Sequence, residues 1–168
     1  DQGGSRAVLS DEHARSGSQS LKGAVGTNGQ YRVERALDGN LATNHWGRIF
    51  YKVETPLAMD GIYVHNTFVA FGRPASDNGS ESRVVDTVMA PNGTHQFLFN
   101  VPDDSCCAGS SYDFSYDGDW HCVEWFVDGD AQSFRFFYEG EEVTDIAFDG
   151  VAGAHIEDFS SVIVGWIN

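Results

Sequence analysis

The segment WHCVEWFVDGDAQSFRFFYEG, residues 120–140, indicates the fold class of this chain. Apolar and polar residues alternate on both sides of Asp128-Gly129-Asp130, whose residue types are typical of a tight turn. Successive side chains of a strand point to opposite faces of a sheet. The first strand therefore places Val123, Trp125 and Val127 on one face and Cys122, Glu124 and Phe126 on the other. The segment predicts an antiparallel hairpin with one face in the core and one face that can carry functional polar residues.

Short alternating runs of this kind follow one another along the chain, separated by Gly, Asn, Asp and Pro. No run has the periodicity of an amphipathic helix, so we expect no helix longer than about three turns. The predicted strands are 29–36, 45–54, 61–71, 81–90, 95–101, 121–127, 134–138 and 161–166. This pattern predicts an all-β chain, in which two antiparallel sheets form a concanavalin-like jelly roll, as a single domain over residues 1–168. Its concave sheet face is expected to hold an extended ligand.

The charge balance excludes some partners. The sequence has 25 acidic and 10 basic residues and a net charge of −15, with no cluster of Lys and Arg. Nucleic acids and anionic membranes are therefore excluded as expected partners, because both need clustered cations. No stretch approaches the roughly 20 apolar residues of a membrane-spanning helix. We expect an acidic monomer.

The cysteines indicate whether the protein is extracellular. There are three of them, Cys106, Cys107 and Cys122. The first two lie in a loop that leads directly into the strand carrying Cys122. One disulfide between Cys122 and either loop cysteine fits this arrangement and would indicate an extracellular protein, whereas reduced structural thiols are the alternative. A zinc site would need more ligands, and His121 points away from Cys122, so a nucleophilic thiol lacks a base.

Four segments together resemble the fungal glucuronan lyases and the secreted, cellulase-co-regulated proteins related to them. These segments are ARSGSQSLK at 14–22, HWGRIFYKVETP at 45–56 with GIYVHNTFVAFG at 61–72, the hairpin at 120–140, and VIVGW at 162–166. The resemblance implies a secreted, polysaccharide-lyase-like jelly roll that cleaves polyuronides by β-elimination. It also implies a structural Ca²⁺ site built from main-chain oxygens around Ser16 and Gln19. Family members complete that site with terminal strands that are not visible here. Either the chain lacks terminal strands of a longer protein, or its terminal strands differ from those of the family.

Cleavage of a polyuronide by β-elimination needs a group that neutralises the C6 carboxylate, a base that takes the C5 proton, and an acid for the C4 oxygen. Arg or a protonated His suits the first role, a neutral His or a deprotonated Tyr suits the base, and Tyr also suits the acid. Strict alternation puts Tyr63, His65 and Thr67 on one face of a strand, and Arg83, Val85 and Thr87 on one face of the next. The resemblance also points to His65 and Arg83. The predicted catalytic residues are His65, Arg83 and Tyr63, and the predicted substrate-binding residues are Thr67, Thr87, Gln96 and Asn100.

Three other functions stay open at this point. Glu124 with Asp128 or Asp130 offers the two carboxylates of a glycosidase, although the spacing is uninformative. The same fold can also serve as a non-catalytic carbohydrate-binding module or as an extracellular structural or adhesive domain.

Oxygen-rich loops at 77–82 and 113–119 are further calcium candidates, but neither has the spacing of an EF-hand.

Overall fold

The computed structural model describes residues 5–25, 29–54, 61–73, 81–101, 108–150, 156 and 159–167. Almost all regular structure in these residues is β-strand. The helical elements among them are two 3₁₀ turns, η1 at Gly39–Ala42 and η4 at Thr144–Ile146. Within the same residues no helix is long and apolar enough to span a membrane. The expectation of an all-β chain without long helices is confirmed.

Each of the eight predicted runs forms a strand, with ends that shift by up to three residues. They are β3 (Tyr31–Ala36), β4 (Asn44–Tyr51), β5 (Val64–Gly72), β6 (Glu81–Met89), β7 (Thr94–Asn100), β9 (His121–Asp128), β10 (Ser133–Tyr138) and β13 (Ser161–Ile167). The strands that the sequence pattern did not reveal are β1 (Arg6–Ser10), β2 (Ser20–Ala24), β8 (Phe114–Ser115), β11 (Glu141–Glu142) and β12 (Phe148–Asp149). Three of these have only two residues, too few for an alternation signal.

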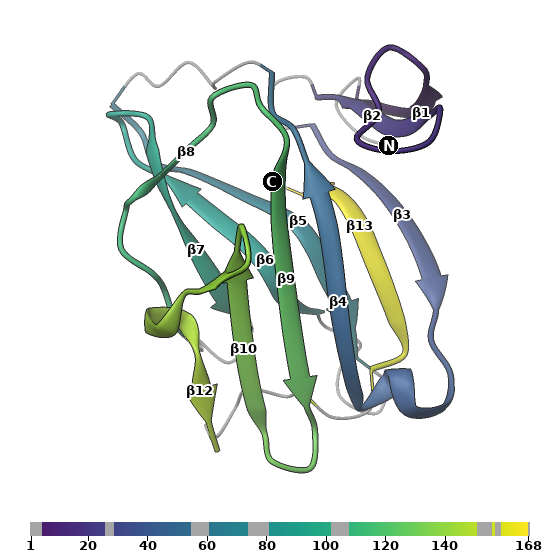
Figure 1. Ribbon diagram of the computed structural model, residues 1–168, viewed down its shortest axis with the longest axis vertical. Helices are drawn as coiled ribbons and strands as arrows, with labels where there is room; N and C mark the ends of the chain where they lie inside the picture. The colour runs from purple at the N-terminus through teal and green to yellow at the C-terminus, as the bar shows by residue number, and fades with distance from the viewer. Residues whose placement is uncertain are drawn as a thin grey trace.

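Two antiparallel sheets form a jelly-roll sandwich (Figure 1). The six-stranded sheet has the order β3-β13-β5-β6-β7-β8. The five-stranded sheet has the order β11-β10-β9-β4, with β12 paired to β10. The predicted two-sheet fold is therefore observed.

The hairpin at 120–140 forms as its sequence predicts. Val127 pairs with Phe134 and Trp125 with Phe136, and all four side chains are buried. Asp128 shapes the turn, because its Oδ1 accepts hydrogen bonds from the backbone N–H groups of Asp130 and Ala131.

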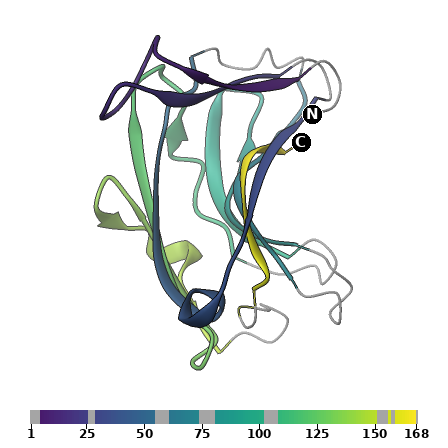
Figure 2. The same cartoon turned by 90° about the vertical axis from the view of Figure 1, so that its right-hand side faces the viewer.

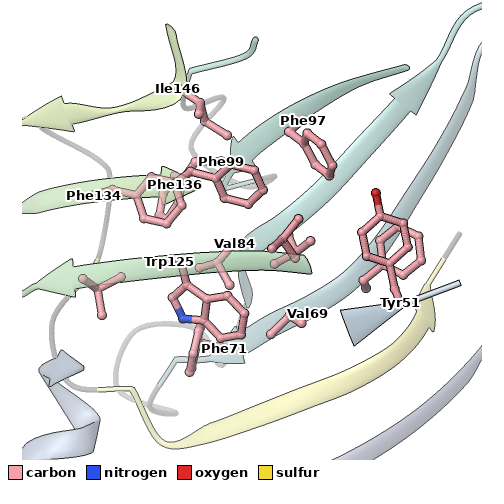
Figure 3. Packing of buried hydrophobic residues seen from close by; sticks show 14 of the residues in the cluster. Tyr51, Val69, Phe71, Val84, Phe97, Phe99, Trp125, Phe134, Phe136 and Ile146 are labelled. Atoms are coloured by element: carbon pink, nitrogen blue, oxygen red, sulfur yellow. The ribbon is translucent and has the colours of Figure 1, made fainter. Parts of the chain in front are cut away.

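Aromatic side chains from both sheets fill the core between them (Figure 3). Phe97, Phe99, Phe134 and Phe136 are fully buried, so they are packing residues and not sugar platforms. Each fully buried side chain of this size contributes about 1.5–3 kcal/mol of hydrophobic stabilisation.

A β-bulge in β6 sets which of its residues leave the core. Three steps along β6, from Arg83 to Asp86, are matched by two steps along β7, from Asn100 to Leu98. As a result Val84 and Val85 both point into the core with no exposed surface. Because the bulge adds one residue to the strand, the residues after it face the opposite side from the one that strict alternation predicts.

The hairpin β1–β2 is a separate two-stranded sheet that lies across one end of the sandwich (Figure 2). His13 Nε2 in its loop lies 2.9 Å from Glu54 Oε1, just after β4. A cavity of about 780 Å³ beneath the hairpin is lined by aromatic side chains that include Tyr31, Tyr51 and Trp166.

Candidate functional site

Polar side chains gather on the outer face of β5, β6 and β7, the face of the six-stranded sheet that points away from the core. Directly opposed residues share a face of a sheet. Ala70 lies on this outer face, because it packs with Ile163 in a cluster separate from the main core. The register gives three rows across the strands: Ala70, Arg83 and Asn100; Thr67, Asp86 and Leu98; and His65, Val88 and Gln96.

Asp86 is the centre of this face, and its side chain has no exposed surface. Its Oδ2 lies 2.5 Å from His65 Nε2 and accepts a 3.0 Å hydrogen bond from Asn100 Nδ2. Its Oδ1 accepts a 2.7 Å hydrogen bond from the Thr67 hydroxyl. A buried carboxylate is stable only when such partners replace its lost hydration. Three partners from two neighbouring strands therefore support an ionised Asp86.

The ionised Asp86 fixes the tautomer of His65. A carboxylate only accepts hydrogen bonds, so the Nε2 facing it must carry the proton. In the neutral ring, Nδ1 is then the unprotonated nitrogen, and the side chain is 39% exposed. A buried aspartate that orients a histidine in this way is the arrangement that serves a general base in hydrolases with a catalytic triad. His65 can accept a proton from a ligand on this face.

Arg83 lies on the same face, opposite Ala70 on β5 and Asn100 on β7. Its Nε is buried and has no hydrogen-bond partner. By contrast, Arg32 is paired with Glu81, and Arg135 with Asp149. No ion pair joins Arg83 to a described carboxylate, so its guanidinium is suited to binding an external anion.

Two tyrosines lie beside the His65 row. Tyr63 precedes β5 and is 60% exposed, and its ring centroid lies 6.1 Å from that of Tyr112. Gln96 is hydrogen-bonded to Tyr112. Burial, together with the neighbouring Tyr63, raises the pKa of the Tyr112 phenol, while the bond with Gln96 lowers it. These residues offer hydroxyl and amide groups next to His65.

One predicted site residue, Thr87, does not belong to this face. Its hydroxyl donates to Asn66 O at 3.1 Å, lies 2.8 Å from the Tyr116 hydroxyl, and is fully buried. The prediction that Thr87 and Arg83 share a face is wrong, because strict alternation ignores the bulge between them. Among the other predicted residues, His65, Thr67 and Asn100 meet at Asp86. Arg83 and Gln96 lie on the same face, and Tyr63 precedes β5.

Asp86 is the residue of this polar face that alternation missed. A strict period of two from Arg83 places Asp86 in the core, where an unpaired carboxylate is excluded. The apolar run Val84-Val85-Asp86-Thr87-Val88 contained a signal, since a carboxylate inside it demands dedicated partners.

The remaining candidates are placed elsewhere. Ser16 and Gln19 are exposed in the loop between β1 and β2. No group of three or more His, Cys, Asp or Glu side chains suited to a metal occurs in the described residues. Cys122 is half-buried on the outer face of the five-stranded sheet and forms no disulfide with another described residue, whereas Cys106 and Cys107 lie outside the described residues.

The carboxylates proposed for a glycosidase have structural roles. Glu124 Oε1 lies 3.7 Å from Arg48 Nη1, and Asp128 accepts the backbone N–H groups of the turn. Their positions give no support to a pair of catalytic carboxylates.

No protein-family profile and no curated protein sequence matches this chain. Among solved structures it is similar to the endo-β-1,4-glucuronan lyase from the fungus Trichoderma reesei, with a TM-score of 0.61 and 15% sequence identity. The similarity covers 99% of this chain and 77% of the lyase chain. At this identity the likeness shows a polysaccharide-lyase-like jelly-roll fold, whereas activity depends on the residues of the site.

Proposed function

We propose that this protein binds an anionic polysaccharide on the outer face of β5, β6 and β7 and cleaves it by β-elimination. The observation that carries the proposal is His65, held by the buried Asp86, on the same face as Arg83, which has no described counter-ion. The likeness to a glucuronan lyase supports the same substrate class, the polyuronides.

In the proposed reaction, Arg83 binds the C6 carboxylate and stabilises the negative charge that develops when the C5 proton leaves. His65 Nδ1 takes this proton. The electron pair of the C5–H bond forms the C4–C5 double bond, and the bond from C4 to the leaving oxygen breaks. Tyr63 donates a proton to that oxygen. Solvent then returns a proton to Tyr63 and takes up the proton that His65 holds.

Thr67 and Asn100 have a different role from the sugar contacts that their sequence positions predict. Both donate hydrogen bonds to Asp86, so we assign them to orienting Asp86 and, through it, His65. Gln96, which lies in the row of His65, is the better candidate for contact with sugar hydroxyls.

Incubation with a panel of polyuronides, followed by the ultraviolet absorbance of the unsaturated product, tests the activity. Replacing Arg83 by Ala should lower the rate by at least ~10²-fold, the lower range for loss of one charge-stabilising group. His65→Ala should have an effect of similar size. Arg35→Ala and His13→Ala, which remove the same residue types from exposed positions, should leave the rate unchanged. Activity that survives both site substitutions would place the chemistry elsewhere.

A non-catalytic carbohydrate-binding module is the second candidate, because the same face would bind a polyuronide without cleaving it. The protein would be a binding module and not a lyase if it binds a polyuronide without releasing an unsaturated product. The His65→Ala/Arg83→Ala double variant should then lose this binding.

We also propose a secreted protein in which Cys122 pairs with Cys106 or Cys107, and a structural calcium ion near Ser16 and Gln19. Mass spectrometry of the secreted protein without reductant tests the disulfide, and three free thiols would refute it. For calcium, thermal unfolding with Ca²⁺ or with chelator is the test, and an unchanged midpoint would argue against a structural ion.

A further inference from the structure

The outer face of the five-stranded sheet carries an exposed aromatic surface on the opposite side of the sandwich from the His65 site. Trp46 on β4 is 63% exposed. Its ring centroid lies 4.9 Å from that of Phe126 and 5.5 Å from that of Phe137, with interplanar angles of 32° and 36°. These tilted contacts join aromatic rings from three strands into one apolar strip. Exposed apolar patches of this kind mark interaction sites.

Two cations lie at one end of this strip. The guanidinium carbons of Arg15 and Arg48 lie 4.8 and 5.6 Å from the ring centroid of Phe50. Arg48 is 60% exposed, and its ion pair with Glu124, 3.7 Å from Nη1 to Oε1, is of the exposed kind that contributes little and leaves the guanidinium accessible. No ion pair joins Arg15 to any carboxylate in the described part of the chain. Two guanidinium groups around one ring, in a protein with a net charge of −15, provide a local site for an anion.

The spacing selects the kind of ligand. Trp46 and Phe50 point to the same face of β4, four residues apart, which is about 13 Å along a strand. A ligand that reaches both must be extended. The positively polarised C–H groups of a pyranose ring complement the electron-rich face of an aromatic ring, and a uronic acid supplies carboxylates for the two arginines.

We propose that Trp46, Phe126, Phe137, Phe50, Arg15 and Arg48 form a second polysaccharide-binding surface that holds a strand of an acidic polysaccharide. The ligand class rests on the proposed function, whereas the location does not. This surface binds the polymer without cleaving it, and keeps the protein on a polymer whose other segments reach the His65 site.

The test measures binding of polyglucuronate by calorimetry in the His65→Ala/Arg83→Ala background, where the first site is disabled. We expect binding to persist there, and to weaken by at least ~10-fold when Arg15→Ala/Arg48→Ala is added. Trp46→Ala should weaken it by a similar factor. The matched control Arg6→Ala/Arg35→Ala removes two exposed arginines from β1 and β3 and should have little effect. Thermal unfolding of each variant checks that the fold is intact.

A neutral version of the ligand, made by reducing the carboxyl groups of the same polymer, separates the two parts of the surface. Its binding should depend on Trp46 and not on Arg15 and Arg48. Loss of all polyglucuronate binding in the His65/Arg83 variant, or equal losses in the Arg15/Arg48 and Arg6/Arg35 variants, would overturn the proposal. If the His65→Ala/Arg83→Ala variant still binds polyglucuronate but the wild-type protein has no lyase activity, the second surface is supported and the lyase function is refuted.

Discussion

Asp86 holds together the polar cluster on the outer face, because it contacts His65, Thr67 and Asn100 at once. Its charge decides which nitrogen of His65 is free. Single residues of this kind set the chemistry of a site even when they never touch the ligand.

Asp86→Asn tests this role. The amide can present its NH₂ group to Nε2, which favours the tautomer with the proton on Nδ1, the wrong one for a base. We expect a loss of roughly 10²–10⁴-fold in lyase rate, by analogy with a triad aspartate, with little change in substrate affinity. Asp38→Asn, at an exposed position, is the control and should be silent. A full rate in Asp86→Asn would show that His65 needs no orienting carboxylate.

His95 predicts how stability depends on pH. Its ring stacks on Tyr116 at 4.2 Å, and both ring nitrogens are buried without partners. Burial, with a smaller contribution from His121, lowers the pKa of His95 to about 4. Since the pKa is about 6.5 in the unfolded chain, the unfolded state takes up this proton first as the pH falls. His95 therefore lowers the free energy of unfolding between about pH 6.5 and 4, by up to roughly 3 kcal/mol, and has no such effect above pH 6.5.

The measurement is urea denaturation at pH 7 and at pH 4.5. His95→Phe should lose less stability between these two values than the wild-type protein. An identical pH dependence in His95→Phe would show that other groups control acid stability.

At the scale of elements, β4 depends on a residue without a side chain. A Cβ atom on Gly47 would lie 2.0 Å from the ring of Trp125 on the neighbouring strand β9, and the ring is 5% exposed. Gly47→Ala must displace this ring from the core. We expect a loss of about 1–3 kcal/mol in the free energy of unfolding, the usual range for overpacking.

The denaturation midpoint of Gly47→Ala, compared with that of Arg48→Ala, tests this. Arg48 is the next residue of the same strand and points to solvent, so its substitution should change stability by no more than about 0.5 kcal/mol. Equal stability of the two variants would mean that Trp125 has room to move.

At the scale of the whole molecule, the sandwich and the hairpin β1–β2 differ in how they are held. The strands β5 and β6 are paired on both sides and carry buried side chains, whereas β1 and β2 pair only with each other within the described sheets. Two-stranded sheets are marginal when they lack further support.

Native-state hydrogen exchange should therefore detect opening of β1–β2 at a lower free energy than opening of β5–β6. His13→Ala, which removes the contact with Glu54, should speed exchange in the hairpin and leave β6 unchanged. Exchange of both regions only through global unfolding would show that the hairpin belongs to the same cooperative unit.

Much of this architecture follows from local sequence. Alternation is a property of neighbouring residues, so it predicted the strands from Tyr31 to Trp166 and the inward face of Val123, Trp125 and Val127. The same alternation placed His65 and Thr67 on one face, as the structure shows. The face on which a residue lies can be predicted without knowing the partner strand, as long as its strand follows the period of two.

Only the tertiary structure decided the phase of β6 and the composition of the site. The bulge at Val84 and Val85 exists because both valines pack in the core between the sheets, and no local pattern reports that packing. It moved Thr87 into the core and Asp86 to the outer face. The contact of Asp86 with His65 joins residues 21 positions apart, so it depends on which strands become neighbours and in which register. The sequence thus determined the elements, whereas long-range packing assembled the site.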